Sequence, residues 1–133
     1  MDELFIYTDG GSRGNPGKSA IGIIVLDNNE KILASHSEFI GIGTNNQAEY
    51  KAIIKALQLI EKFKAKKLFF FSDSELVIKQ LKGEYKINNP ELLKLNNKVK
   101  ELSKNYSIIY NNVRRSNKFI SLADSLLNKA LDN

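Results

Sequence analysis

The sequence of 133 residues contains no cysteine, no tryptophan, only one histidine and only two prolines. The absence of cysteine excludes a disulfide framework and thiolate chemistry. The single histidine, His36, lies inside a predicted strand, and we interpret it as a surface or sheet residue without a catalytic role. Any chemistry must therefore be built on other side chains.

The sequence also lacks long hydrophobic runs, internal repeats and linker-like segments. Its first residues, MDELFIY, carry neither a basic leader nor the apolar stretch of a signal peptide or membrane span. We therefore expect a single domain over residues 1–133, monomeric, located in the cytoplasm and without a membrane partner. The net charge of +5 favours a polyanionic partner but does not specify one.

Hydrophobic periodicity predicts nine elements. Strands are expected at 4–9, 20–27, 31–39, 68–71 and 107–113, and helices at 46–63, 74–82, 91–104 and 119–131. The continuous apolar run 68–71 is typical of a central strand covered on both faces. This order of elements predicts a mixed α/β layer fold.

Three helix starts have capping signals. Asn46 is predicted to cap the first helix, with Glu49 at its third position, and Asn89 with Pro90 is predicted to open the third. Asp73 is a candidate cap for a helix that begins at Ser74.

The stretch 5–17, FIYTDGGSRGNPG, leads an apolar run into an acid and then into glycines and a proline. We predict that the strand ends at Asp9 and that the following residues form a turn. Gly17, Lys18 and Ser19 resemble the end of a phosphate-binding loop, but the sequence argues against one, because Ser12 stands where that motif needs glycine and a strand-like segment follows. A dinucleotide-binding fingerprint is excluded because its glycine spacing is absent.

Four acids occupy unusual positions. Asp9 and Asp73 follow apolar strands, whereas Glu49 and Asp124 lie on the apolar stripes of their helices. For three of them a structural role stays open: Asp9 could stabilise a turn, Glu49 could complete a capping box, and Asp73 could cap a helix. Asp124 is different, because a mid-helix carboxylate that faces a core needs a partner.

The four acids together indicate a shared cation. Carboxylates gathered at one edge of a sheet repel one another unless a cation neutralises them. Oxygen ligands without histidine or cysteine favour Mg²⁺ or Mn²⁺ over zinc. The residues therefore predict a two-metal site for phosphodiester hydrolysis.

Four segments resemble the motifs of type 1 ribonuclease H, in the order of that family and over nearly the whole chain. They are TDGGSRGNPG at 8–17, TNNQAEY at 44–50, SDS at 72–74 and ADSL at 123–126. The resemblance implies a ribonuclease H-like fold with a five-stranded mixed sheet flanked by helices. It also implies endonucleolytic cleavage of the RNA strand of RNA/DNA hybrids, leaving 3′-hydroxyl and 5′-phosphate ends, with two Mg²⁺ ions for which Mn²⁺ can substitute.

The resemblance assigns residues to roles. The catalytic acids and metal ligands become Asp9, Glu49, Asp73 and Asp124. Asn45 and Asn46 are expected near the hybrid, with helix capping as the alternative, and Asn15 and Thr44 in a pocket for a DNA phosphate. The complete set of expected substrate-binding residues is Gly10, Gly11, Ser12, Asn15, Thr44, Asn45, Asn46, Ser74, Arg114 and Arg115.

The sequence departs from the family pattern in three places. The loop 114–118, RRSNK, has no histidine, and an arginine cannot shuttle protons, so Arg114 and Arg115 are limited to an electrostatic role. The link 83–90 is too short for the basic protrusion of some relatives, and Glu75 replaces a glutamine found in several.

Two other functions fit parts of the sequence. A hybrid-binding module without activity would be expected to lack at least one acid, whereas all four are present. Another nuclease of the superfamily would not be expected to carry the motifs at 8–17 and 44–46. Cleavage of double-stranded RNA and the preferred metal stay open.

Overall fold

The computed structural model describes residues 2–133. Its elements are β1 (Glu3–Arg13), β2 (Gly17–Leu26), β3 (Ile32–Gly43), α1 (Asn45–Leu59), the 3-10 helix η1 (Ile60–Phe63), β4 (Lys67–Ser72), α2 (Glu75–Leu81), α3 (Pro90–Leu102), β5 (Ser107–Asn112) and α4 (Lys118–Asp132). Every predicted strand and helix is present. No helix in this part of the chain is long and apolar enough to cross a membrane.

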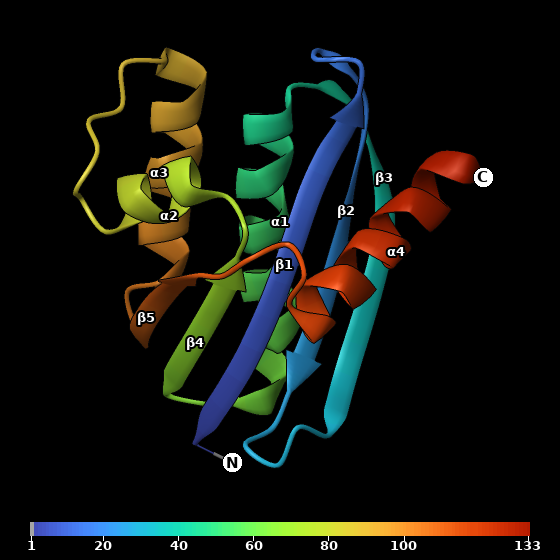
Figure 1. The fold of residues 1–133 in the computed structure, drawn as a ribbon. Coiled ribbons are helices and arrows are strands. Elements are labelled where there is room, and N and C mark those ends of the chain that lie inside the picture. Colours follow the sequence, from blue (N-terminus) through green and yellow to red (C-terminus); the bar gives the residue numbers. More distant parts are fainter. Residues whose placement is uncertain (1) are drawn as a thin grey trace.

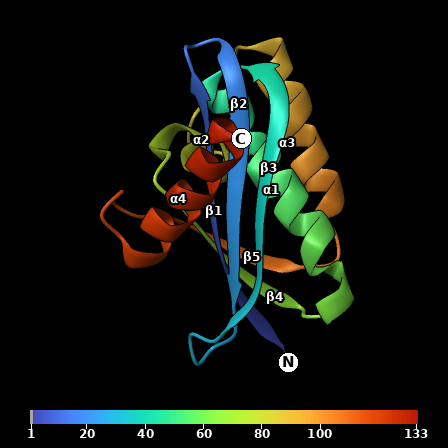
Figure 2. The ribbon, with the colours of Figure 1, turned by 90° about the vertical axis from the view of Figure 1, so that its right-hand side faces the viewer.

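The five strands form one mixed sheet in the order β3-β2-β1-β4-β5 (Figure 1). The first three strands form an antiparallel meander, and β4 and β5 then run parallel to β1. Figure 2 shows α1 and α3 on one side of the sheet and α4 on the other. The predicted five-stranded mixed sheet flanked by helices is therefore confirmed.

The two faces of the sheet are covered unequally. On one face a large core joins β1, β2 and β4 to α1 and α3, with Tyr50 and Phe70 among its fully buried side chains. On the other face a smaller core lies beneath α4 and contains Tyr7 and Phe119. In β4 buried residues alternate with half-buried ones, and the half-buried Phe71 packs against the smaller core, so one face of this internal strand is fully covered and the other only partly. α4 packs over β1 to β3 on this side, and Val113, just after β5, also packs against the smaller core.

The prediction that the first strand ends at Asp9 was wrong, because β1 continues to Arg13. β2 pairs with β1 from Phe5 to Arg13 and matches Asp9 with Gly22, so the glycine-rich part of β1 also has a pairing partner. On the other side of β1, pairing with β4 stops at Tyr7 and Phe71. The pairing of β1 with β4 thus ends near the position where the sequence indicated the end of the strand. Beyond this point the edge of β1 that faces β4 has no pairing strand among residues 2–133.

Two predicted caps are also corrected. Thr44, not Asn46, caps α1: its hydroxyl accepts from the Gln47 backbone N–H, and the Gln47 side chain accepts from the Thr44 N–H. Ser74, not Asp73, caps α2 by accepting from the Val77 N–H. The sequence offered several adjacent cap residues, and the path of the incoming chain selected among them. The predicted cap of α3 by Asn89 is confirmed.

Candidate active site

The site lies at the open edge of β1, beyond the end of its pairing with β4. Here the Gly10 N–H donates to Glu49 Oε1 over 2.7 Å. This contact requires glycine, because a Cβ on Gly10 would lie 2.3 Å from the backbone carbon and oxygen of Ala48. Because residue 10 has no side chain, the first turns of α1 approach β1 closely enough for the Glu49 carboxylate to contact the strand backbone. Its carboxylate is engaged by β1 and not by a capping box.

A second glycine brings α4 to the same edge. Gly22 pairs with Asp9 in the sheet, and a Cβ at Gly22 would lie 2.0 Å from the backbone oxygen of Ala123. α4 therefore rests directly on the backbone of β2, and Asp124 follows at the point of closest approach. The two close contacts, made through Gly10 and Gly22, draw one acid from each flanking helix towards Asp9.

The structure places the four predicted acids around one pocket of about 320 Å³. Three of them form a compact group: one carboxylate oxygen each from Asp9, Glu49 and Asp73 lie within 4.8 Å of one another. Asp124 lines the same pocket from α4. The pocket is lined by Asp9, Gly10, Gly11, Asn45, Glu49, Asp73, Ser74, Arg115, Asp124 and Leu127.

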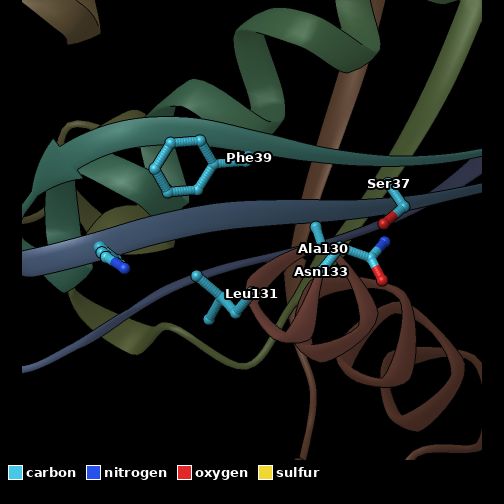
Figure 3. A pocket seen from close by; sticks show the side chains of 6 residues that line it. Ser37, Phe39, Ala130, Leu131 and Asn133 are labelled. Atoms are coloured by element: carbon cyan, nitrogen blue, oxygen red, sulfur yellow. The ribbon is translucent and has the colours of Figure 1, made fainter.

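A larger pocket, of about 450 Å³, lies elsewhere, between the outer strands and the end of α4 (Figure 3). Phe39 and Ser37 face it from β3, and Ala130, Leu131 and Asn133 from the C-terminal segment. No carboxylate is among its lining side chains, so its size does not make it a centre of acid or metal chemistry.

Burial and mutual repulsion raise the pKa values of the inner acids. The pKa of Asp9 rises to about 8, first because the group is buried, then because of the Asp73 charge and the neighbouring Asp124 carboxyl. The pKa of Glu49 is also raised well above its usual value by burial and by the charges of Asp9 and Asp73, although the Gly10 hydrogen bond opposes the shift. The Gly10 hydrogen bond and the Arg115 charge thus compensate the negative charge of these acids only in part.

The donor set fits a hard divalent cation. All donors in the compact group are carboxylate oxygens, and Mg²⁺ binds oxygen ligands that lie at most about 4 Å apart around one ion, close to the spacing seen here. The one arginine among the pocket residues, Arg115, places its Nε 3.4 Å from Asp73 Oδ2, but its side chain is 87% exposed. Such an exposed guanidinium neutralises little of the buried charge. Asp9, Glu49 and Asp73 would hold the ion, with Asp124 beside them.

The two predicted loop arginines occupy different surroundings. Arg115 reaches the acids, whereas Arg114 does not line the pocket and makes no ion pair among residues 2–133. His36 lies on β3, where its Nε2 is 2.7 Å from Glu38 Oε1 and outside the pocket. His36 is therefore a sheet residue outside the acid pocket, in agreement with the interpretation from the sequence.

The predicted substrate-binding residues divide into three groups: residues that line the pocket, residues beside it, and residues away from it. Gly10, Gly11, Asn45, Ser74 and Arg115 line the pocket. Ser12 and Asn15 lie beside it, because Asn45 Oδ1 accepts from the Ser12 N–H at 2.8 Å and Asn15 Oδ1 accepts from the Asn45 N–H at 3.0 Å.

These contacts tie the turn between β1 and β2 to the start of α1. Thr44 uses its hydroxyl for the helix cap. Thr44, Asn46 and Arg114 do not contribute to the pocket lining, so the structure does not bring these three to the acids.

Sequence reasoning missed two residues that shape the site, Gly22 and Asn128. A glycine inside an apolar strand is a signal for close backbone approach, and Gly22 interrupts such a run. Asn128 donates to Asp124 Oδ2 at 3.2 Å from one helical turn further along α4. Its signal was the spacing of four residues from an acid on the same helix face.

The fold and the acid pocket define a ribonuclease H-like domain. A family model described as reverse transcriptase-like matches residues 7–130. The solved structure of RNase H1 from the archaeon Halobacterium salinarum superimposes with a TM-score of 0.93, at 37% identity, and the match covers 98% of each chain. LC11-RNase H1, solved in complex with an RNA/DNA hybrid, has a TM-score of 0.92 at 34% identity, over 97% of this chain and 96% of that one.

The chain belongs to the type 1 ribonuclease H family. Among curated relatives, it is 39% identical to ribonuclease HI of Halobacterium salinarum over 95% of this chain and 31% identical to ribonuclease HI of Helicobacter pylori over 82%. It spans 63% of the first relative's length and 78% of the second's. A bifunctional protein of Mycobacterium tuberculosis matches at 37% identity over 98% of this chain, which spans 36% of that protein.

Proposed function

We propose that this protein is a metal-dependent endoribonuclease that hydrolyses the RNA strand of RNA/DNA hybrids and leaves 3′-hydroxyl and 5′-phosphate ends. The observation that carries the proposal is the compact group of Asp9, Glu49 and Asp73 in one pocket with Asp124. Family membership and the hybrid complex of LC11-RNase H1 support this choice among phosphodiester substrates. A cytoplasmic location and a monomeric state stay predictions.

The proposed cofactor is Mg²⁺, as two ions, with Mn²⁺ as a substitute. When bound, the ions supply an activated water and a positive charge for the leaving oxygen. Asp9 on β1 and Glu49 on α1 offer buried carboxylates, and Asp73, just after β4, places its carboxylate beside them, so these three would hold an ion. Asp124 closes the pocket from α4. Among residues 2–133, the lining of the pocket includes neither histidine nor lysine, the side chains that could serve as a neutral general base, which agrees with a nucleophile generated by metal.

Substrate contacts are proposed for the pocket rim. The side chain of Asn45 accepts from the Ser12 N–H with its Oδ1, and its amide nitrogen has no acceptor among residues 2–133, so this nitrogen can donate to a ribose hydroxyl. Such a donor recognises RNA by its 2′-hydroxyl without reading base sequence. Arg115 would meet a phosphate at the outer side of the same pocket.

The test is a cleavage assay with end-labelled RNA/DNA, RNA/RNA and DNA/DNA duplexes of one sequence, each with Mg²⁺, with Mn²⁺ and with excess chelator. We expect internal cuts in the RNA of the hybrid, and only with metal. Mapping the ends of the products checks the predicted 3′-hydroxyl. Turnover by the wild type in chelator would contradict the metal mechanism.

The same assay decides between the alternatives. A hybrid-binding module would shift the hybrid in a gel but cut nothing, and a nuclease of another type would cut the DNA duplex. Cleavage of RNA/RNA alongside the hybrid would widen the substrate range without changing the mechanism.

A further inference from the structure

A short chain of hydrogen bonds connects the glycine-rich end of β1 to the acid on α4. Asn128 lies one helical turn after Asp124, and its amide nitrogen donates to the Asp124 backbone oxygen at 3.0 Å and to Asp124 Oδ2 at 3.2 Å. On its other side, Asn128 Oδ1 accepts from Arg13 Nη2 at 3.4 Å. Arg13 Nη1 also forms an ion pair of 2.6 Å with Asp132 Oδ1. Arg13 therefore holds two residues on successive turns of α4.

The polarity of these groups allows only one orientation of the Asn128 amide. A guanidinium only donates hydrogen bonds and a carboxylate only accepts them. The amide must therefore turn its oxygen towards Arg13 and its nitrogen towards Asp124. The two acceptors of Asp124 already require the nitrogen on their side, and Arg13 reinforces the same orientation from the other side, as the contact of Asn128 Oδ1 among residues 2–133.

Asp124 has more need of such support than the inner acids. Asp9 and Glu49 are each 8% exposed and fixed by their surroundings, whereas Asp124 is half-buried and stands on a helix at the rim. The negative charge of Asp9 also repels the Asp124 carboxylate when both are ionised. A donor on Asp124 Oδ2 limits the rotation of the carboxylate that faces the pocket.

We propose that Asn128, oriented by Arg13, is a positioning residue that holds the Asp124 carboxylate in place for metal binding and catalysis. This inference rests on the proposed function, because it assigns Asp124 to the metal-dependent site. Groups that support metal-binding carboxylates in this way affect metal affinity without touching the metal. The competing interpretation is that Asn128 only bonds back to the helix backbone and Arg13 only anchors the end of α4.

The experiment measures Mn²⁺ affinity of the nucleic-acid-free protein by titration calorimetry, together with thermal unfolding in chelator. Asn128→Leu removes the amide while keeping the size of the side chain. Asn128→Gln keeps an amide that can still reach a carboxylate four residues earlier on a helix. Lys129→Ala, at an exposed position on the same turn, is the matched control. Asp132→Asn weakens the ion pair with Arg13 but leaves Asn128 intact.

We expect Asn128→Leu to bind Mn²⁺ about tenfold more weakly than wild type. Asn128→Gln should recover much of this loss, and Lys129→Ala and Asp132→Asn should match wild type. Arg13→Ala should weaken Mn²⁺ binding in the same direction by a smaller factor. Because the Arg13 side chain is half exposed, this variant also decides the question if Asn128→Leu does not fold. In hybrid cleavage, kcat should fall for Asn128→Leu while KM stays close to the wild-type value.

An Asn128→Leu or Arg13→Ala variant with the Mn²⁺ affinity of Lys129→Ala would overturn the inference. So would an Asn128→Gln variant as weak as Asn128→Leu. Wild type that binds Mn²⁺ but cuts no hybrid would overturn the proposed function alone, because the affinity comparison would still stand. Wild type that binds no Mn²⁺ would overturn both.

Discussion

The pocket has an inner half and an outer half, and the two are built differently. In the inner half, Asp9 is part of the sheet and Glu49 accepts from a strand N–H, and each is 8% exposed. In the outer half, Asp73 and Asp124 are half-buried and held by side chains, Arg115 and Asn128. Backbone geometry thus positions the inner acids, whereas the outer acids are contacted by side chains, one half-buried and one exposed.

This difference indicates how the site tolerates change. A carboxylate positioned by the backbone is not displaced by substitutions on the surface. It is displaced, however, when its strand or helix moves. A carboxylate held by a side chain loses precision gradually. We therefore expect large and nearly complete losses from changes in the inner half, and graded losses from changes in the outer half.

The largest effect is expected for Asp9→Asn. Removal of a ligand at the centre of the group should reduce hybrid cleavage by about a thousandfold or more, because the metal contribution to the transition state amounts to several kcal/mol. In chelator the same variant should unfold at or above the wild-type temperature, since it removes one repelling charge. Magnesium should stabilise wild type more than the variant. If Asp9 only supported the fold, the variant would be less stable in chelator and would gain as much from magnesium.

Next in size are changes that separate the elements carrying the acids. Gly10→Ala would force α1 away from β1, and Gly22→Ala would force α4 away from β2, because each new Cβ would overlap a helix backbone. We expect either change to lower the free energy of unfolding by about 1–3 kcal/mol. Mn²⁺ affinity should fall further for Gly10→Ala, which displaces Glu49 of the inner half.

Gly11→Ala is the control for this pair. A Cβ at Gly11 would lie 3.5 Å from Leu127 Cδ1, an ordinary contact, so stability should stay within about 0.5 kcal/mol of wild type. Denaturant unfolding and calorimetric titration of the three variants measure both effects. Equal Mn²⁺ affinities for Gly10→Ala and Gly22→Ala would contradict the division into two halves.

A moderate effect is expected from pH in the metal-free protein. The pKa of Asp9 is raised to about 8 in the folded state, above its value in the unfolded chain. A raised folded-state pKa means that protonation favours folding, so this stabilisation is complete at low pH and is lost as pH rises from about 4 to about 8. Urea midpoints across this range, in chelator, should therefore fall more steeply for wild type than for Asp9→Asn. Saturating magnesium should remove the difference in slope.

The smallest effect is expected for Arg115→Ala. Because this ion pair with Asp73 is exposed, the stability should change by at most about 1 kcal/mol. Hybrid cleavage should fall severalfold, and the salt dependence of hybrid binding should lose about one unit of slope if Arg115 meets a phosphate. Arg114→Ala, which removes a similar charge away from the acids, is the matched control. Equal salt slopes for the two variants would remove Arg115 from the proposed substrate contacts.

Much of the architecture was determined by the sequence alone. The order of strands and helices follows from local hydrophobic periodicity, and the cap at Asn89 from a local pattern of residues. The four acids could be grouped because they end apolar strands or interrupt apolar helix stripes. These signals are local, so they survive without knowledge of the fold.

Only the tertiary structure decided how those acids are held. Asp9 lies within β1 and not at its end, because β2 continues the pairing that the sequence suggested would stop at the glycines. Gly22 brings α4 onto the sheet, and Arg13 contacts Asn128 across a separation of 115 residues. Arg115 reaches Asp73 while its neighbour Arg114 does not line the pocket. Each of these contacts joins distant segments whose relative placement depends on the packing of the whole sheet, and local sequence carries no information about that placement.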